Sequence, residues 1–116
     1  MKGPHATLAA LGTLRALRAH ERRHLPFLRT CADHDLVHEI GYRELSGRPA
    51  TQKQLFLLDV GSVATVQRRL RRLRNLGVIQ QQRREDDRRL MEFALTPRTL
   101  AAFERYGELL KRRLGR

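Results

Sequence analysis

Features of secreted and membrane-spanning proteins are scarce in this sequence. Its 116 residues include one cysteine, Cys31, so no disulfide can form within the chain, which fits a reducing compartment. Arg15 and Arg18 interrupt the apolar residues that follow Lys2, which excludes the core of a signal peptide. No apolar run approaches the roughly 18 residues that cross a bilayer. We therefore expect a cytoplasmic protein that does not bind membranes.

Motifs that carry catalysis are also missing. The sequence shows no Ser/His/Asp arrangement, no phosphate-binding glycine loop and no pair of carboxylates that would share a cleft. Asp86 and Asp87 are adjacent, but they fall in an expected hairpin tip, which offers no shielded pocket for acid–base chemistry. We expect that the protein is not an enzyme.

Histidines give only a weak metal signal. His20 with His24 and His34 with His38 have the i,i+4 spacing that can hold a metal ion on a helix. Zinc needs three or four converging ligands, and surface histidines on arginine-rich helices explain the same pattern. Cys31 is a redox sensor only if its thiolate is stabilised, and a plain cysteine is the simpler interpretation. We expect no metal and no other cofactor.

Positive charge is what the chain has in excess. Its formal net charge is +12 and its pI is about 11.5, which predicts an anionic partner. Between Arg68 and Arg89, nine arginines stand against three acidic residues, and the stretch from Ser62 to Arg84 has no Asp or Glu. An exposed helix that is merely solvated usually carries acidic partners at i,i+4. This concentration favours nucleic acid as the partner.

Size and patterning predict one mainly α domain with a small β-hairpin, a winged helix-turn-helix. Leucine spacing predicts helices within residues 1–48. A short helix, a glycine-containing turn and a longer helix form the helix-turn-helix over 49–76. Two short strands with a charged tip form the wing over 77–96, and a C-terminal helix follows over 97–116.

Local signals set the expected boundaries of these helices. Thr and Ser residues cap the helix starts, and a glycine ends the longer helix in a left-handed conformation. The residues are Thr30 with Asp33, Thr51 with Gln54, Ser62, Gly77, and Thr96 with Pro97. Helical and strand periodicity then predicts the core. Its members are Leu36, Val37, Ile40 and Leu45; Val63, Val66, Leu70 and Leu73; and Met91, Phe93 and Leu95, with Leu90, Glu92 and Ala94 on the opposite strand face.

The expected recognition helix, residues 62–76, carries candidate DNA contacts on the face opposite its apolar stripe. Residues near the start of such a helix reach the base edges, and later ones meet phosphate. The candidates for base contacts are Ser62, Ala64, Thr65 and Arg68. Those for phosphate contacts are Arg71 and Arg72, with Gln67, Arg69 and Arg74 flanking the face.

The expected wing tip, residues 83–89, adds a second candidate contact. Arginines at a hairpin tip are placed to enter an adjacent minor groove, where narrow segments have enhanced negative potential. The candidates are Arg83, Arg84, Asp87, Arg88 and Arg89. A carboxylate in the tip can pair with an arginine and fix its direction. For Glu85 and Asp86, a solvated charged turn explains the acidic residues equally well.

Residues 49–96 resemble the MarR family of bacterial winged-helix regulators. The motif Asp87-x-Arg89, followed by a strand that ends in Leu95-Thr96, matches the wing of that family in residues and spacing. The recognition helix and its exit, Ser62-x-x-Thr65 with Leu70, Leu73, Gly77 and Ile79, are also similar. The resemblance implies that Arg89 enters the minor groove and that Asp87 orients it.

The same resemblance implies a homodimer that is formed by the terminal helices, here Thr7–His24 and Leu100–Leu114. It also makes a small-molecule effector possible, because many members bind one between those helices and the DNA-binding part. The chain is shorter than typical members and offers one helix after Thr96 where they have two.

Together these signals predict a transcriptional regulator of the bacterial nucleoid that binds double-stranded DNA sequence-specifically as a dimer. An accessory RNA-binding protein is the alternative from another class, since basic helices also serve RNA. An architectural protein that binds DNA of any sequence is a third possibility.

Overall fold

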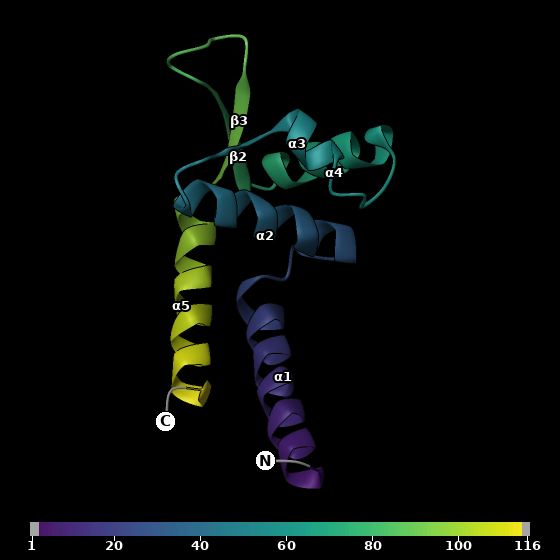
Figure 1. Ribbon diagram of the computed structural model, residues 1–116, viewed down its shortest axis with the longest axis vertical. Coiled ribbons are helices and arrows are strands. Elements are labelled where there is room, and N and C mark those ends of the chain that lie inside the picture. Colours follow the sequence, from purple (N-terminus) through teal and green to yellow (C-terminus); the bar gives the residue numbers. More distant parts are fainter. Residues whose placement is uncertain (1–2, 115–116) are drawn as a thin grey trace. The chain divides into compact units, whose positions relative to one another are not determined.

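The computed structural model describes residues 3–114, which form five helices and three strands (Figure 1). In chain order these are α1 (Pro4–His24), α2 (Cys31–Leu45), β1 (Ala50–Thr51), α3 (Gln52–Phe56), α4 (Val63–Asn75), β2 (Ile79–Arg83), β3 (Met91–Leu95) and α5 (Pro97–Leu114). This architecture confirms the predicted mainly α fold with a small wing. In the described part of the chain, none of the helices has the length and apolar character that crossing a membrane requires.

Two compact units make up the described chain. One contains residues 27–100, and the other combines residues 3–26 with residues 101–114. Helix α5 begins in the first unit and continues into the second. The expectation of a single domain with the four segments given above stays a prediction.

Capping side chains start the helices where the sequence predicts. The Thr30 hydroxyl accepts from the Asp33 amide at 3.1 Å, and the Asp33 carboxylate accepts from the Thr30 amide at 3.3 Å. Thr51 and Gln54 form the same reciprocal pair at the start of α3. Ser62 accepts from the third amide of α4. These hydrogen bonds satisfy amide groups that have no partner inside the helix.

The wing is the antiparallel pair β2–β3, and a third strand extends it into a sheet of order β1-β3-β2. Ala50 of β1 pairs with Phe93, and Ile79 of β2 pairs with Leu95. The two-residue strand β1 was not predicted. Because β3 lies between two strands and is contacted by α2 and α3, Ala94 is only 5% exposed. The prediction that Ala94 faces away from the core is therefore wrong.

The core of the 27–100 unit contains most of the residues that periodicity predicts. Leu36, Val37 and Ile40 of α2 and Val66, Leu70 and Leu73 of α4 are all buried. Two predictions were wrong, since Val63 is 52% exposed and Leu45 is 76% exposed. Val63 is the first residue of α4 and Leu45 the last of α2, so each lies at a helix end with packing partners on one side only.

Gly77 turns the chain from α4 into the wing. Its φ of 73° lies in the left-handed region, as predicted for a helix-ending glycine. The Val78 amide donates to the Leu73 carbonyl at 2.9 Å, and the Gly77 amide to the Arg74 carbonyl at 3.0 Å. This Schellman-type closure sets the direction in which β2 leaves α4.

Candidate nucleic-acid interface

One side of α4 is a continuous polar surface. Val66, Leu70 and Leu73 are buried on the opposite side, which leaves six polar or small residues exposed. They are Ala64, Gln67, Arg68, Arg71, Arg74 and Asn75. No acidic residue lies on α4, so five charged or amide groups face solvent without an anionic neighbour on the same helix.

Two residues of the predicted base-contacting group bind each other. The Ser62 hydroxyl accepts from the Thr65 amide at 3.2 Å and lies 3.0 Å from the Thr65 hydroxyl. Both hydroxyls are therefore engaged in capping α4. Of the four candidates, Ala64 and Arg68 are the exposed residues whose side chains remain available for a ligand.

Arg72 does not belong to the exposed face. Its Nη1 lies 3.2 Å from Asp33 Oδ2 and 3.0 Å from the Phe27 carbonyl oxygen, so the guanidinium points toward the start of α2. The predicted phosphate contact of Arg72 does not fit this position. Arg69 is half-buried, and its buried Nε has no hydrogen-bond partner within residues 3–114.

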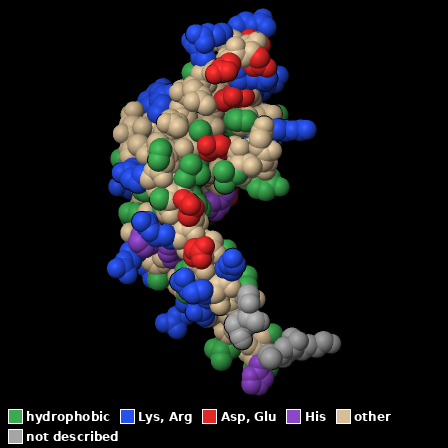
Figure 2. All heavy atoms as spheres, turned by 90° about the vertical axis from the view of Figure 1, so that its left-hand side faces the viewer, with side chains coloured by type: hydrophobic (Ala, Val, Ile, Leu, Met, Phe, Trp, Pro, Cys, Tyr) green, Lys and Arg blue, Asp and Glu red, His purple; other side chains and the backbone are tan. Residues whose placement is uncertain are grey.

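The wing tip contains the pair that the sequence predicts. Arg89 donates from Nε to Asp87 Oδ1 at 3.1 Å and from Nη2 to Oδ2 at 3.3 Å, and its side chain is 91% exposed. The Arg89 side-chain and backbone hydrogen bonds hold the pKa of Asp87 below its usual value. The carboxylate thus stays ionised and holds an arginine that projects into solvent. Figure 2 shows this concentration of basic and acidic side chains at the top of the picture, where the hairpin tip lies.

Arg83 and Arg84 form hydrogen bonds within the hairpin tip. Arg83 donates to the Arg88 carbonyl oxygen at 2.7 Å. Arg84 binds Asp86 through two hydrogen bonds of 2.8 and 2.6 Å, and this contact lowers the pKa of Asp86 and raises that of Arg84. Asp86 is therefore a structural partner within the tip. Among the predicted wing contacts, Arg83, Arg88 and Arg89 are the exposed arginines, and Arg83 is bonded to the Arg88 carbonyl oxygen.

Sequence reasoning missed the polar residues beside α4. Arg74 donates from Nη1 to Oε1 of Gln81 on β2. Gln52, at the start of α3, lines a small cleft next to Arg74. The three consecutive glutamines 80–82 were a possible signal, because alternate residues of a strand face the same side. Their partner on α4 could not be found without the turn at Gly77.

The terminal helices form their own contacts in the second unit. Tyr106 of α5 donates to Glu21 of α1 at 2.9 Å, and burial together with this bond raises the pKa of Tyr106 to about 12. The ring of His20 lies 4.5 Å from that of His24, whose pKa is lowered by desolvation and by neighbouring cations. Within residues 3–114, no group of three potential metal ligands comes together.

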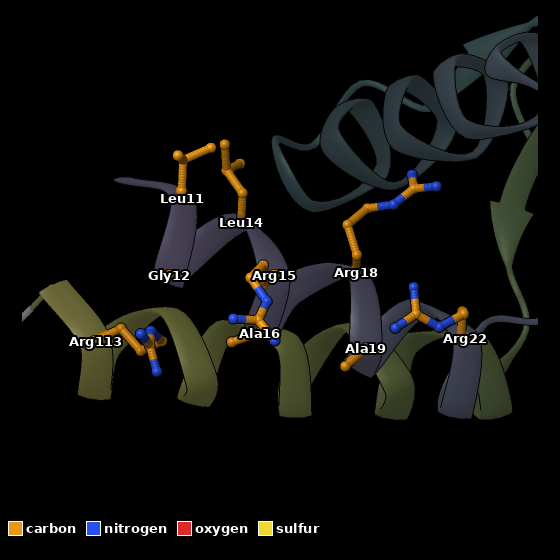
Figure 3. Close-up of a pocket in the computed structure, with 9 residues that line it drawn as sticks. All are labelled: Leu11, Gly12, Leu14, Arg15, Ala16, Arg18, Ala19, Arg22 and Arg113. Carbon is orange, nitrogen blue, oxygen red and sulfur yellow. The ribbon is translucent and has the colours of Figure 1, made fainter. Parts of the chain in front are cut away.

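Helix α1 presents an exposed face in this unit. None of its 21 residues is buried, and Leu8, Leu11 and Leu14 are 71%, 53% and 54% exposed. A groove of about 680 Å³ runs along α1, and Leu11, Leu14 and Arg18 extend from the side of α1 away from the α5 ribbon (Figure 3). Within the described chain, the charged residues that line this groove are all arginines, namely Arg15, Arg18 and Arg22 of α1 and Arg113 of α5.

Known proteins share this arrangement of helices and wing. Residues 33–99 match the model of the winged helix DNA-binding domain. The crystal structure of MarR is 26% identical with a TM-score of 0.51, and the alignment covers 97% of this chain and 84% of MarR. A transcriptional regulator from Thermotoga maritima is 18% identical with a TM-score of 0.65, over 98% of this chain and 78% of that one. A variant of MepR from S. aureus, bound to an oligodeoxyribonucleotide, is 14% identical with a TM-score of 0.63, over 96% and 79%. A search of curated proteins found no match.

Proposed function

Because the chain belongs to the winged helix DNA-binding domain family and has the fold of the MarR regulators, we propose that it is a transcriptional regulator that reads double-stranded DNA sequence-specifically. In this proposal α4 enters a major groove and the tip of the β2–β3 hairpin enters the adjacent minor groove. The MepR variant with a bound oligodeoxyribonucleotide is a precedent for DNA binding by this fold.

Arg68 is the proposed base-reading residue on α4. It is exposed, it lies in the N-terminal half of the helix, and no ion pair engages it within the described residues. Its planar fork suits the two acceptors that guanine presents in the major groove. Ala64, one turn earlier on the same face, is small enough to let the helix approach and to contact a thymine methyl group.

Arg89 is the proposed minor-groove residue. An exposed arginine loses much conformational entropy when it inserts into a groove. The two hydrogen bonds that Arg89 donates to Asp87 reduce that loss because they preorganise the guanidinium. Arg88 lies beside it and adds charge without a fixed direction. The Asp87–Arg89 pair at an exposed tip is the single observation that carries the proposed function.

We also propose a homodimer that is formed through α1 and α5. The three exposed leucines of α1 form an apolar strip that the described residues leave more than half open to solvent. Glu104 and Glu108 of α5 are exposed and have the i,i+4 spacing of one helix face, so a second copy can pair them with the α1 arginines. Burial of the leucines supplies the free energy of dimerisation, and the opposite charges set the register between the helices of the two copies. A dimer of this kind would read two half-sites about one helical turn apart.

A competition experiment tests the function. Labelled duplex fragments selected from random DNA are bound to the full chain and competed with unlabelled cognate DNA, random DNA and duplex RNA. We expect cognate DNA to compete at least about a thousandfold better than random DNA, as is usual for specific binding. The shallow minor groove of duplex RNA offers no site for Arg89, so a DNA regulator should bind duplex RNA weakly. Equal competition by duplex RNA would therefore favour an accessory RNA-binding protein. Equal competition by random DNA would favour an architectural protein.

A further inference from the structure

A small polar cleft lies beside α4 in the unit of residues 27–100. Its volume is about 200 Å³. Its lining residues are Gln52, Gln67, Leu70, Arg71, Arg74 and Phe93. Leu70 and Phe93 are buried residues of the core, whereas the other four lining side chains are polar. None of these lining residues is acidic, so within the described chain two arginines share the cleft without a counter-charge.

Arg74 is held in place at this cleft. Its Nη1 donates to Oε1 of Gln81 on β2, which links the end of α4 to the wing. A guanidinium has five N–H groups, so this bond leaves further donors for a ligand. Arg71 is three residues earlier on the same helix face and forms no ion pair with any described residue. Two neighbouring cations of this kind repel each other unless an anion binds between them.

The position of the cleft identifies the anion. In duplex DNA one sugar–phosphate strand separates each major groove from the adjacent minor groove. If α4 lies in a major groove and the hairpin tip in the next minor groove, that strand must pass between α4 and the hairpin. The cleft lies there, because its residues come from α3, α4 and β3 and because Arg74 of α4 is bonded to Gln81 of β2.

We propose that the cleft binds one backbone phosphate of the strand that separates the two grooves. Arg71 and Arg74 supply the positive charge, and the side-chain amides of Gln52 and Gln67 donate hydrogen bonds to the phosphate oxygens. This proposal rests on the proposed function, since it assumes that α4 and the wing occupy adjacent grooves. The bound phosphate would fix the distance of the recognition helix from the backbone and so the register in which Arg68 meets the bases.

Salt dependence is the first test. The affinity for one duplex is measured by fluorescence anisotropy from about 50 to 200 mM KCl, and each neutralised phosphate contributes about 0.9 to the slope of log K against log salt. We expect the Arg71→Gln/Arg74→Gln double variant to reduce that slope by about one and the affinity about tenfold, equally on cognate and random DNA. The Arg105→Gln/Arg112→Gln double variant on α5 is the control for loss of two charges elsewhere. A slope change no larger than that of the control would overturn the proposal.

A neutral phosphate provides the sharper test. Methylphosphonate groups are placed one at a time along the duplex, which removes a single negative charge at each position. We expect one position between the two grooves where the substitution weakens binding of the wild-type protein about tenfold but leaves the double variant unaffected. Additive effects at every position would overturn the cleft assignment.

Two further measurements keep the outcomes distinct. Thermal unfolding by circular dichroism checks that the variants fold, which the exposure of Arg71 and Arg74 leads us to expect. Arg74→Lys retains the charge without the fork, so it should keep the wild-type salt slope while losing part of the affinity. Failure of the wild-type chain to bind duplex DNA would overturn both the function and the cleft. Wild-type binding without any coupling between phosphate and arginine would overturn the cleft alone.

Discussion

Arg72 of α4 binds the buried carboxylate of Asp33 at the start of α2. The distance from Nη1 to Oδ2 is 3.2 Å, and the side chain of Asp33 is fully buried while that of Arg72 is 25% exposed. Asp33 Oδ2 also accepts from the amides of Arg29 and Thr30. One carboxylate oxygen therefore caps α2 and holds α4 against it, which fixes the rotation of α4 about its axis and so the residues that it presents.

The first prediction concerns this ion pair. Arg72→Met keeps the length of the side chain but leaves the buried carboxylate without its cation. We expect a loss of about 2–4 kcal/mol in the free energy of unfolding, measured by urea denaturation. Arg71→Gln, one residue earlier and exposed, is the matched control and should change stability by less than about 0.5 kcal/mol. Equal effects of the two substitutions would contradict the positioning role of Arg72.

Local signals in the sequence were reliable because their partners lie within a few residues. The capping pairs Thr30–Asp33 and Thr51–Gln54 form as predicted, and so does the Asp87–Arg89 pair, whose members are two residues apart. In each case the geometry of one turn brings the groups together, so a pattern of residue types is sufficient evidence.

Long-range partners could not be predicted in the same way. A helical wheel places Arg72 on the polar side of α4, but its partner Asp33 is 39 positions away on another helix. Periodicity also missed β1, because two residues are too few to show alternation, and so it assigned Ala94 to an outer face. The exposed arginines could therefore be predicted as a group, whereas the role of each one depended on tertiary contacts.

The second prediction separates the roles of Arg68 and Arg89. Arg68→Ala should remove about 1–3 kcal/mol of discrimination between cognate and random DNA, because a base contact is lost. Arg89→Ala should weaken binding to most sequences by a similar factor. Both affinities are measured on the same set of duplexes at one salt concentration. Equal losses on cognate and random DNA for Arg68→Ala would contradict its assignment as the base-reading residue.

The third prediction concerns the pH response of the wing. The pKa of Asp87 is lowered chiefly by the side-chain hydrogen bond that Arg89 donates to it. The pair therefore stays intact at pH values above the usual pKa of an aspartate, and it breaks only as the pH falls through the lowered pKa. Arg89→Gln should raise the pKa of Asp87 toward the ordinary value of an aspartate, as measured by NMR titration of the carboxyl carbon. Arg88→Gln is the control, and an equal rise in that variant would show that general charge, rather than this bond, lowers the pKa.

The fourth prediction compares two glycines. Gly77 has a φ of 73°, where an added Cβ is strained, so Gly77→Ala should destabilise the protein by about 1–2 kcal/mol. Gly107 lies within α5 with open space where a Cβ would be, so Gly107→Ala should stabilise it by about 0.5–1 kcal/mol. Thermal unfolding of both variants checks the opposite signs. Two changes of the same sign would contradict the left-handed turn at Gly77 as the link between recognition helix and wing.

The fifth prediction tests the dimer. Leu11 is 53% exposed between Leu8 and Leu14, so Leu11→Glu would bury a charge at the proposed interface and should shift the protein to monomer in sedimentation equilibrium. Leu57→Glu, at a residue that is 76% exposed in the unit of residues 27–100, is the control and should leave the dimer intact. The monomeric variant should keep its affinity for a single half-site but lose the gain from a second one, because that gain depends on the two copies being joined. A dimer that persists in Leu11→Glu would place the interface elsewhere on the chain.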